Sequence, residues 1–169
     1  MRGNAVLGEV LTIWATILRD WTRIAKICAL LSEPLTAVRN PALPDRSPLL
    51  RDADPQHAPH LFCEESFVCV CAELGLEAAD DRQFLVQAVE FANQKLWGTL
   101  SAALTVHPSF RSEPQGAACF QAALRDLQYG AVGVNHWPGL VYAMMSPPWG
   151  GFPIGTLADA QSGIGAVHN

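Results

Sequence analysis

Hydrophobic residues recur at every third or fourth position over the first thirty residues of the chain. From Val6 to Leu31 the apolar side chains keep this spacing, and the charged side chains lie mostly between them. This is the period of an α-helix with one apolar face. The longest uncharged run, Val10 to Leu18, is far shorter than the roughly 18 residues that a membrane helix needs. We therefore predict an amphipathic helix in residues 1–33 and no membrane span.

Proline interrupts the pattern in the next stretch. Half of the chain's 12 prolines lie between Pro34 and Pro59, among scattered charges and with little hydrophobic periodicity. Each proline disfavours a helical conformation at the residue before it. Residues 34–60 are therefore predicted to form an irregular connector.

The remainder, residues 61–169, begins with a strand pattern followed by a helix pattern. The continuous apolar run from Phe67 to Leu74 predicts a strand buried on both faces. Asp80 and Asp81 are suited to begin a helix, and Gly98 is suited to end it. Between them an apolar stripe repeats at helical spacing, consisting of Phe84, Leu85, Ala88, Val89, Ala92 and Leu96.

A second strand, a second helix and a third strand follow. The apolar segment from Thr99 to His107 predicts a strand that ends at Pro108, and Ser112 to Gly130 predicts a helix with its two ends. Residues 131–135 predict a short third strand. The order indicates an α/β fold with a parallel strand-helix-strand-helix-strand core, preceded by the N-terminal amphipathic helix. Residues 147–165, rich in glycine and proline, show little regular structure.

Length and composition narrow the class of protein. A chain of 169 residues favours one domain, and the 50% share of apolar residues excludes global disorder. The net charge of -5 argues against a nucleic-acid partner, because duplex binding needs clustered basic side chains. Five cysteines are an odd number and no secretory leader is evident, so we expect reduced thiols and a cytoplasmic location.

Candidate ligand-binding residues lie at the predicted strand ends. Ligands of open parallel sheets bind outside the carboxyl ends of the strands, where this chain has His107, Asn135, His136 and Trp137. The two histidines either meet a ligand there or play a capping or structural part. Glu64 and Glu65 precede the first strand, where a carboxylate either accepts hydrogen bonds from ribose hydroxyls or is simply solvated.

Other features are less specific. Trp149 lies in a turn whose glycines allow the backbone to approach a neighbouring element, such as a helix, closely. The densest group of potential zinc ligands matches none of the usual paired spacings, so no metal is predicted; it comprises His57, His60, Cys63, Cys69 and Cys71. Cys28 and Cys119 lie in apolar helix stripes and are expected in the core.

Taken in order, six short motifs between Leu61 and Asn169 resemble the C-terminal part of the NAD(P)-dependent aldehyde dehydrogenases. They are Glu64 to Phe67, Ala88 to Asn93, Leu96 to Ala102, Tyr129 to Asn135, Pro148 to Phe152 and Ser162 to Gly165. The resemblance implies that residues 61–169 are a partial catalytic domain of a divergent member, since the usual Gly-Pro after the phenylalanine is Val68-Cys69 here.

The resemblance also implies roles for single residues. Glu65 would bind the nicotinamide ribose of NAD or NADP, and Phe67 would pack beside the nicotinamide. Trp149 would line the aldehyde tunnel, and His136 and Trp137 would border it.

The same family uses a cysteine nucleophile, a glutamate base and a Rossmann domain, all of which precede the matched motifs. Counting back from Glu65 runs off the start of this chain, and none of its cysteines has the Gly-Gln-x-Cys context. The expectation is a fragment of an aldehyde-oxidising enzyme that is inactive alone. The alternative is a non-catalytic interaction module that associates with a full-length aldehyde dehydrogenase or with itself.

Overall fold

The computed structural model describes residues 37–38, 49–50, 53–64 and 71–168. These residues fall into two compact units. One holds residues 76–94 and 98–168, and the other holds 37–38, 49–50, 53–64, 71–75 and 95–97. The predicted N-terminal helix, Glu65 and Phe67 lie outside the described residues.

A parallel strand pair lies at the centre of the larger unit. β4 (Ser101–Leu104) pairs with β5 (Ala131–Val134) in a register that runs from Ser101↔Ala131 to Leu104↔Val134. The chain between them forms α4 (Pro108–Ser112) and α5 (Pro114–Asp126). All four residues of β4 are buried, as expected for a strand covered on both faces. The predicted strand-helix-strand crossover is confirmed for this pair.

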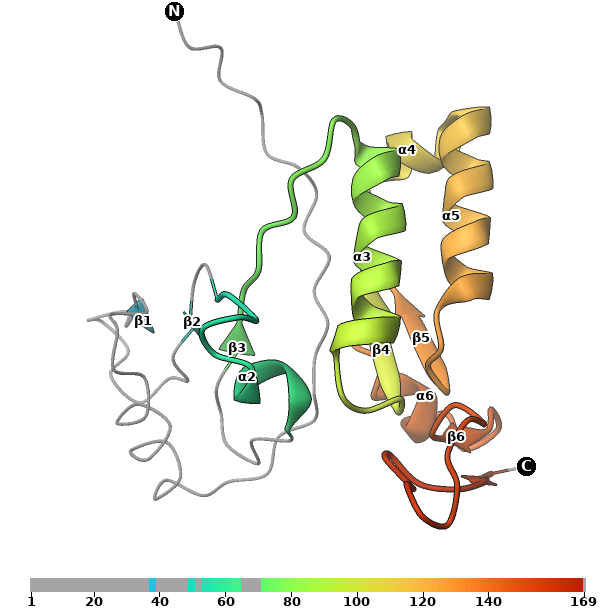
Figure 1. Cartoon of the computed structure of the whole chain (residues 1–169). Helices are drawn as coiled ribbons and strands as arrows, with labels where there is room; N and C mark the ends of the chain where they lie inside the picture. Colours follow the sequence, from blue (N-terminus) through green and yellow to red (C-terminus); the bar gives the residue numbers. More distant parts are fainter. Residues whose placement is uncertain (1–36, 39–48, 51–52, 65–70, 169) are drawn as a thin grey trace, which may run out of the picture. The chain divides into compact units, whose positions relative to one another are not determined.

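Helix α3 (Asp81–Lys95) lies beside α5, and the two run in the same direction (Figure 1). At their starts Arg82 donates to the side chain of Gln115. At their ends Asn93 donates to the carbonyl of Asp126, at 2.8 Å, and accepts from the Gln128 amide, at 2.9 Å. The buried residues of the two helices include Leu85, Ala88, Val89 and Ala92 from the predicted stripe of α3, and Phe120 and Ala123 from that of α5.

The helix boundaries follow the predicted signals. The Asp80 carboxylate accepts from the Gln83 amide at 2.8 Å, and this bond together with the Arg82 guanidinium lowers the pKa of Asp80. Gly98, after α3, has a φ of 98°, a conformation that glycine adopts without strain. Pro114 begins α5 as predicted, whereas Pro108, predicted only to end a strand, begins α4, a short helix that was not predicted and that ends at Ser112. Within the described ranges, no helix has the length and apolar character needed to cross a membrane.

The C-terminal part of the larger unit contains α6 (Leu140–Ala143) and a small antiparallel sheet. β6 (Trp149–Gly150) pairs with β7 (Ala166–Val167), with Trp149 opposite Val167. Within residues 147–165 only the two residues of β6 are regular, so the predicted lack of regular structure is confirmed. A two-residue strand is too short to show an alternating pattern, so its pairing is decided by the backbone of its partner.

The smaller unit corrects two expectations. β1 (Ala37–Val38), β2 (Leu49–Leu50) and α2 (His60–Cys63) lie in or across the predicted connector, so that stretch is not wholly irregular. β3 (Cys71–Ala72) is the described part of the predicted first strand, and it pairs in parallel with β2, in a sheet other than that of β4 and β5. Ala72 is exposed, so the predicted burial on both faces is wrong at this end of the strand. Backbone pairing does not require burial of the side chains.

Candidate functional site

Four segments that are distant in the sequence meet at Thr99, just before β4. Its carbonyl oxygen accepts from the amides of Gly130, at 2.8 Å, and Phe152, at 3.0 Å. Its own amide donates to the hydroxyl oxygen of Ser162 at 2.7 Å. Thr99 is only 8% exposed, so these bonds are largely shielded from water. Four of the six sequence motifs thus form one structural unit.

Glycines allow these segments to approach closely. A Cβ atom at Gly130 would overlap the carbonyl oxygen of Gly150, and one at Gly150 would overlap that of Gly165. Any side chain at either position would push the two backbones apart. The close neighbour that the sequence predicts for these glycines is therefore another loop backbone and not a helix.

Asn135 joins the carboxyl ends of the two parallel strands. Its side-chain oxygen accepts from the Val106 amide at 2.7 Å, and its side-chain nitrogen donates to the Val106 carbonyl at 3.0 Å. Its own amide donates to the carbonyl of Leu104 at 3.0 Å. Asn135 has a φ of 55°, in the left-handed region that asparagine tolerates better than most residues. This geometry fixes where the chain leaves β5.

The residues that follow this junction are exposed. His136 is exposed, and Trp137 is 66% exposed, with its ring lying over Gly139. His107, at the end of the other strand, caps α4: its Nδ1 atom accepts from the Ser109 amide at 3.3 Å. Of the two readings of His107 in the sequence, the structure supports the capping one.

Trp149 lies in a cluster of three rings. Its indole contacts Tyr142 edge-on, with ring centroids 5.8 Å apart, and Tyr142 contacts His168 at 5.1 Å. α6, β6 and the residue after β7 each contribute one ring. Among the described residues, neither His136 nor Trp137 makes a ring contact with this cluster, so the structure brings together only part of the predicted substrate-facing set.

Comparison with solved structures identifies the fold. The chain is similar to an indole-3-acetaldehyde dehydrogenase whose crystal structure contains NAD+, with a TM-score of 0.50 and 20% identity over 79% of this chain and 25% of that one. The chain has the fold of part of an aldehyde dehydrogenase. The chain is also similar to a Burkholderia cenocepacia protein described as an aldehyde dehydrogenase. That comparison has a TM-score of 0.49 and 24% identity, over 78% of this chain and 26% of that one.

The structural comparison confirms the resemblance drawn from the six motifs at the level of the fold. The chain spans about a quarter of the length of the aldehyde dehydrogenases that it matches. No protein-family model matches the sequence, and no curated protein matches it either. The three-dimensional arrangement is thus more recognisable than the sequence that forms it.

Of the two free thiols that the structure describes, that of Cys119 has surroundings that disfavour a reactive thiolate. Burial raises the pKa of the Cys119 thiol, which favours the protonated and less reactive form. The Cys119 sulfur lies 3.7 Å from the carbonyl oxygen of Arg82, at the α3–α5 contact. Cys63 is exposed and unpaired with another cysteine. Cys119 is only half-buried and is not among the core residues, so its predicted place in the core is wrong.

The structure describes only some of the residues considered above as potential zinc ligands. His57 binds the Asp54 carboxylate, with Nδ1 2.6 Å from Oδ2, and the bonds from Gln56 and His57 lower the pKa of Asp54. Cys69 lies outside the described residues. In the parts of the chain that the structure describes, no three His, Cys, Asp or Glu side chains are grouped to hold a metal ion.

The turns after the parallel strands do not fit the phosphates of a dinucleotide. Such phosphates bind at a glycine-rich turn that opens a helix. Here the turn after β4 is Thr105–His107, which contains no glycine, and the turn between β5 and α6 contains one, Gly139, which is covered by the Trp137 ring. Within the described residues, no turn of this kind offers a cradle for a dinucleotide.

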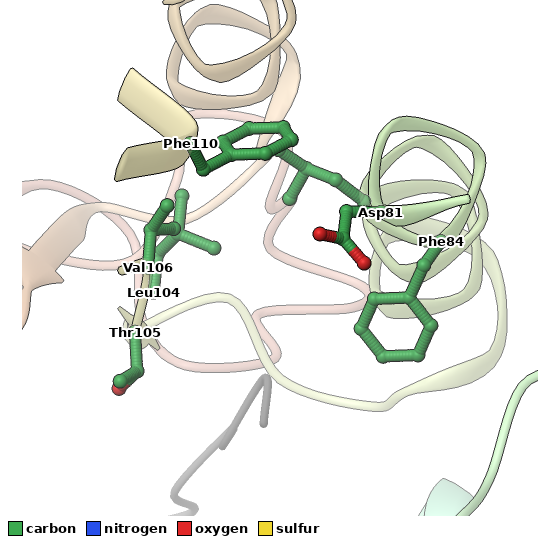
Figure 2. Close-up of a pocket in the computed structure, with 7 residues that line it drawn as sticks. Asp81, Phe84, Leu104, Thr105, Val106 and Phe110 are labelled. Atoms are coloured by element: carbon green, nitrogen blue, oxygen red, sulfur yellow. The ribbon is translucent and has the colours of Figure 1, made fainter. Parts of the chain in front are cut away.

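A pocket at the carboxyl end of β4 was not predicted from the sequence. It is a small pocket of about 30 Å³ that opens to solvent, and Figure 2 shows its walls. The lining residues are Asp81, Phe84, Leu85, Leu104, Thr105, Val106 and Phe110. The sequence assigns Asp81 to a helix start and Phe84 to an apolar stripe. Only the packing of α4 brings Phe110 to the same place.

Proposed function

We propose that residues 61–169 are part of the catalytic domain of an NAD(P)-dependent aldehyde dehydrogenase, and that this chain alone does not oxidise aldehydes. The meeting of four family motifs at Thr99 carries this proposal. The bonds from Gly130, Phe152 and Ser162 to Thr99 hold together four of the six segments that carry the resemblance.

The site residues follow from the resemblance. Glu65 binds the nicotinamide ribose, Phe67 packs against the nicotinamide, and Trp149 lines the aldehyde tunnel with His136 and Trp137 at its border. NAD or NADP, when bound, accepts the hydride from the substrate. The structure of the similar indole-3-acetaldehyde dehydrogenase contains NAD+, which supports a nicotinamide cofactor. The ring contacts around Trp149 support an apolar substrate-facing wall.

The first test measures activity of the purified full chain. We expect no NADH formation from NAD+ with acetaldehyde or indole-3-acetaldehyde, because none of the cysteines has the Gly-Gln-x-Cys context of the family's nucleophile. An intact aldehyde dehydrogenase serves as the positive control. Steady NADH formation that disappears in Cys63→Ser or Cys119→Ser would show that the chain has its own nucleophile and would overturn the proposed inactivity.

The second test measures the cofactor contact. Saturation-transfer NMR detects weak ligands, and we expect NAD+ binding on the order of millimolar or weaker, since one carboxylate and one ring supply few contacts. Glu65→Gln should weaken the signal, and Glu64→Gln, the matched control, should leave it unchanged. Loss of binding in Glu64→Gln alone, or no binding of NAD+ or NADP+ to the chain, would contradict the assigned role of Glu65.

A second candidate function is a non-catalytic module that associates with a full-length aldehyde dehydrogenase. The distribution of exposed apolar side chains favours it: among the described residues, all the large ones except Val86 and Trp97 lie between Trp137 and Val167. Leu157 is 98% exposed. Concentrated apolar surface of this kind is typical of an interaction site.

Sedimentation of the chain with a purified intact aldehyde dehydrogenase tests the second candidate. A complex that Leu157→Asp disrupts would support it. Val86→Asp is the matched control, because Val86 is also exposed but lies on α3. If the chain sediments separately from the enzyme at all concentrations, or if both variants act alike, the interaction module is excluded.

A further inference from the structure

The pocket at the end of β4 is lined by one carboxylate, that of the exposed Asp81, by Thr105 and by five apolar side chains. Figure 2 shows the Asp81 carboxylate directed into the space that Phe84 and Phe110 border. Leu85, Leu104 and Val106 add aliphatic walls, and all three are buried. A ligand that entered this space would remove water from the carboxylate, so it would have to bring a positive charge or a hydrogen-bond donor in return.

Arg82, the basic residue nearest to Asp81 in the sequence, already has partners within the protein. Arg82 donates to the Asp80 carboxylate at 2.8 Å and to the Gln115 side chain. Asp80 in turn caps α3 through the Gln83 amide. Among the described residues, no side chain forms an ion pair with Asp81. The charge of Asp81 therefore remains for a ligand, whereas that of Asp80 is used within the protein.

The aromatic walls favour the same kind of ligand. The face of a phenylalanine ring attracts an organic cation, and Phe84 and Phe110 both line the pocket. A single carboxylate is too few ligands for a bound divalent metal, which takes several oxygen atoms. Methylene groups next to a cationic nitrogen would pack against the aliphatic walls.

We propose that this pocket binds an alkylammonium group, with Asp81 as its counter-ion and Phe84 and Phe110 against its alkyl part. The group belongs either to a small free amine or to a lysine side chain of a partner. This site shares no residue with the set assigned to the cofactor and the aldehyde, so it does not depend on the proposed dehydrogenase function.

The walls of the pocket are held by contacts elsewhere in the fold. Val106 is fixed through its amide and carbonyl by the side chain of Asn135. Phe110 is held by the close contact of α4 with α5, since a Cβ atom at Gly116 would overlap the Phe110 carbonyl oxygen. A pre-formed wall lowers the cost of ordering the site when a ligand binds.

The experiment is an NMR titration of the full chain with n-butylammonium chloride, followed through the methyl groups of Leu104 and Val106. We expect saturable shifts at these methyl groups and little shift with n-butanol, which has the same alkyl chain without the charge. Asp81→Asn, which keeps the shape of the side chain, should weaken binding about fivefold or more, as expected for loss of one close charge. Glu77→Gln removes an exposed carboxylate outside the pocket and should have no such effect.

Nα-acetyl-lysine amide distinguishes the two sources of the group. Tighter binding than n-butylammonium indicates a lysine of a partner, and weaker binding indicates a free amine. The proposal is overturned if n-butanol binds equally well, if Asp81→Asn and Glu77→Gln weaken binding equally, or if the methyl signals do not saturate. Dispersed amide spectra of both variants establish that they are folded.

Discussion

The parallel strand pair with its helices and the C-terminal segment from Trp137 to His168 differ in how they are stabilised. β4 is buried at every position, and α3 and α5 each bury apolar residues of their predicted stripes. The C-terminal segment has strands of two residues and most of the exposed large apolar side chains. It contacts the first region through the Phe152 amide and the Ser162 hydroxyl, which both bond to Thr99, and through the close approach of Gly150 to Gly130. The first region contains buried core residues, and the second exposes most of its large apolar side chains.

The largest expected difference between the two regions comes from truncating one leucine in each. Leu104 is 1% exposed, so Leu104→Ala should lower the free energy of unfolding by about 2–5 kcal/mol. Leu157 is 98% exposed, and Leu157→Ala should change it by less than about 0.5 kcal/mol. Urea unfolding followed by circular dichroism measures both. Equal effects of the two variants would remove the distinction between the regions.

The two tyrosines of the chain, Tyr129 and Tyr142, are expected to affect stability differently at alkaline pH. Burial raises the pKa of Tyr129 to about 12, and its hydroxyl donates to the Ala92 carbonyl at 3.2 Å. Because the folded pKa lies above the unfolded value near 10, this stability is fully present below about pH 10 and is lost as pH rises towards 12. The loss should be on the order of 2–3 kcal/mol.

Phenylalanine variants check this assignment. Tyr129→Phe should remove the alkaline loss measured between pH 9 and 12 by urea unfolding, a range that brackets the two pKa values (about 10 and about 12). Tyr142 is 51% exposed, so Tyr142→Phe should retain it. An alkaline transition that persists unchanged in Tyr129→Phe would mean that another group causes it.

The connection between the two regions can be broken at one glycine. Gly130→Ala places a Cβ atom against the Gly150 carbonyl and should cost about 1–3 kcal/mol of stability, since the backbones must separate. Gly75→Ala is the control, because nothing lies within 4 Å of the added atom there. Thermal unfolding of both variants measures the difference. A Gly130→Ala protein as stable as the Gly75→Ala protein would disprove the close approach.

The smallest expected effect concerns Asn135, where the chain passes from the first region to the second. Asn135→Ala loses both bonds to Val106 and should cost about 1–2 kcal/mol. Asn135→Gly should cost less, since glycine adopts the φ of 55° without strain. The order is checked by urea unfolding. Equal stability of Asn135→Ala and the unchanged protein would show that the side-chain bonds contribute nothing.

Local sequence patterns were sufficient to predict the parts of the fold that depend on residues close together in the chain. The stripes of α3 and α5, the cap at Asp80, the turn at Gly98 and the order of β4, α5 and β5 all follow from local periodicity and helix-end signals. The order of the sequence motifs also pointed to the aldehyde dehydrogenases, and the fold agrees.

Tertiary structure alone decided which distant residues meet. The bonds at Thr99, the ring cluster around Trp149 and the joining of Asp81 with Phe110 in one pocket each link segments whose separation no local pattern encodes. The prediction that β3 joins the sheet of β4 and β5 was wrong for the same reason, because β3 pairs with β2. A strand of two residues is selected by the backbone that lies beside it, and that backbone is placed only when the whole chain packs.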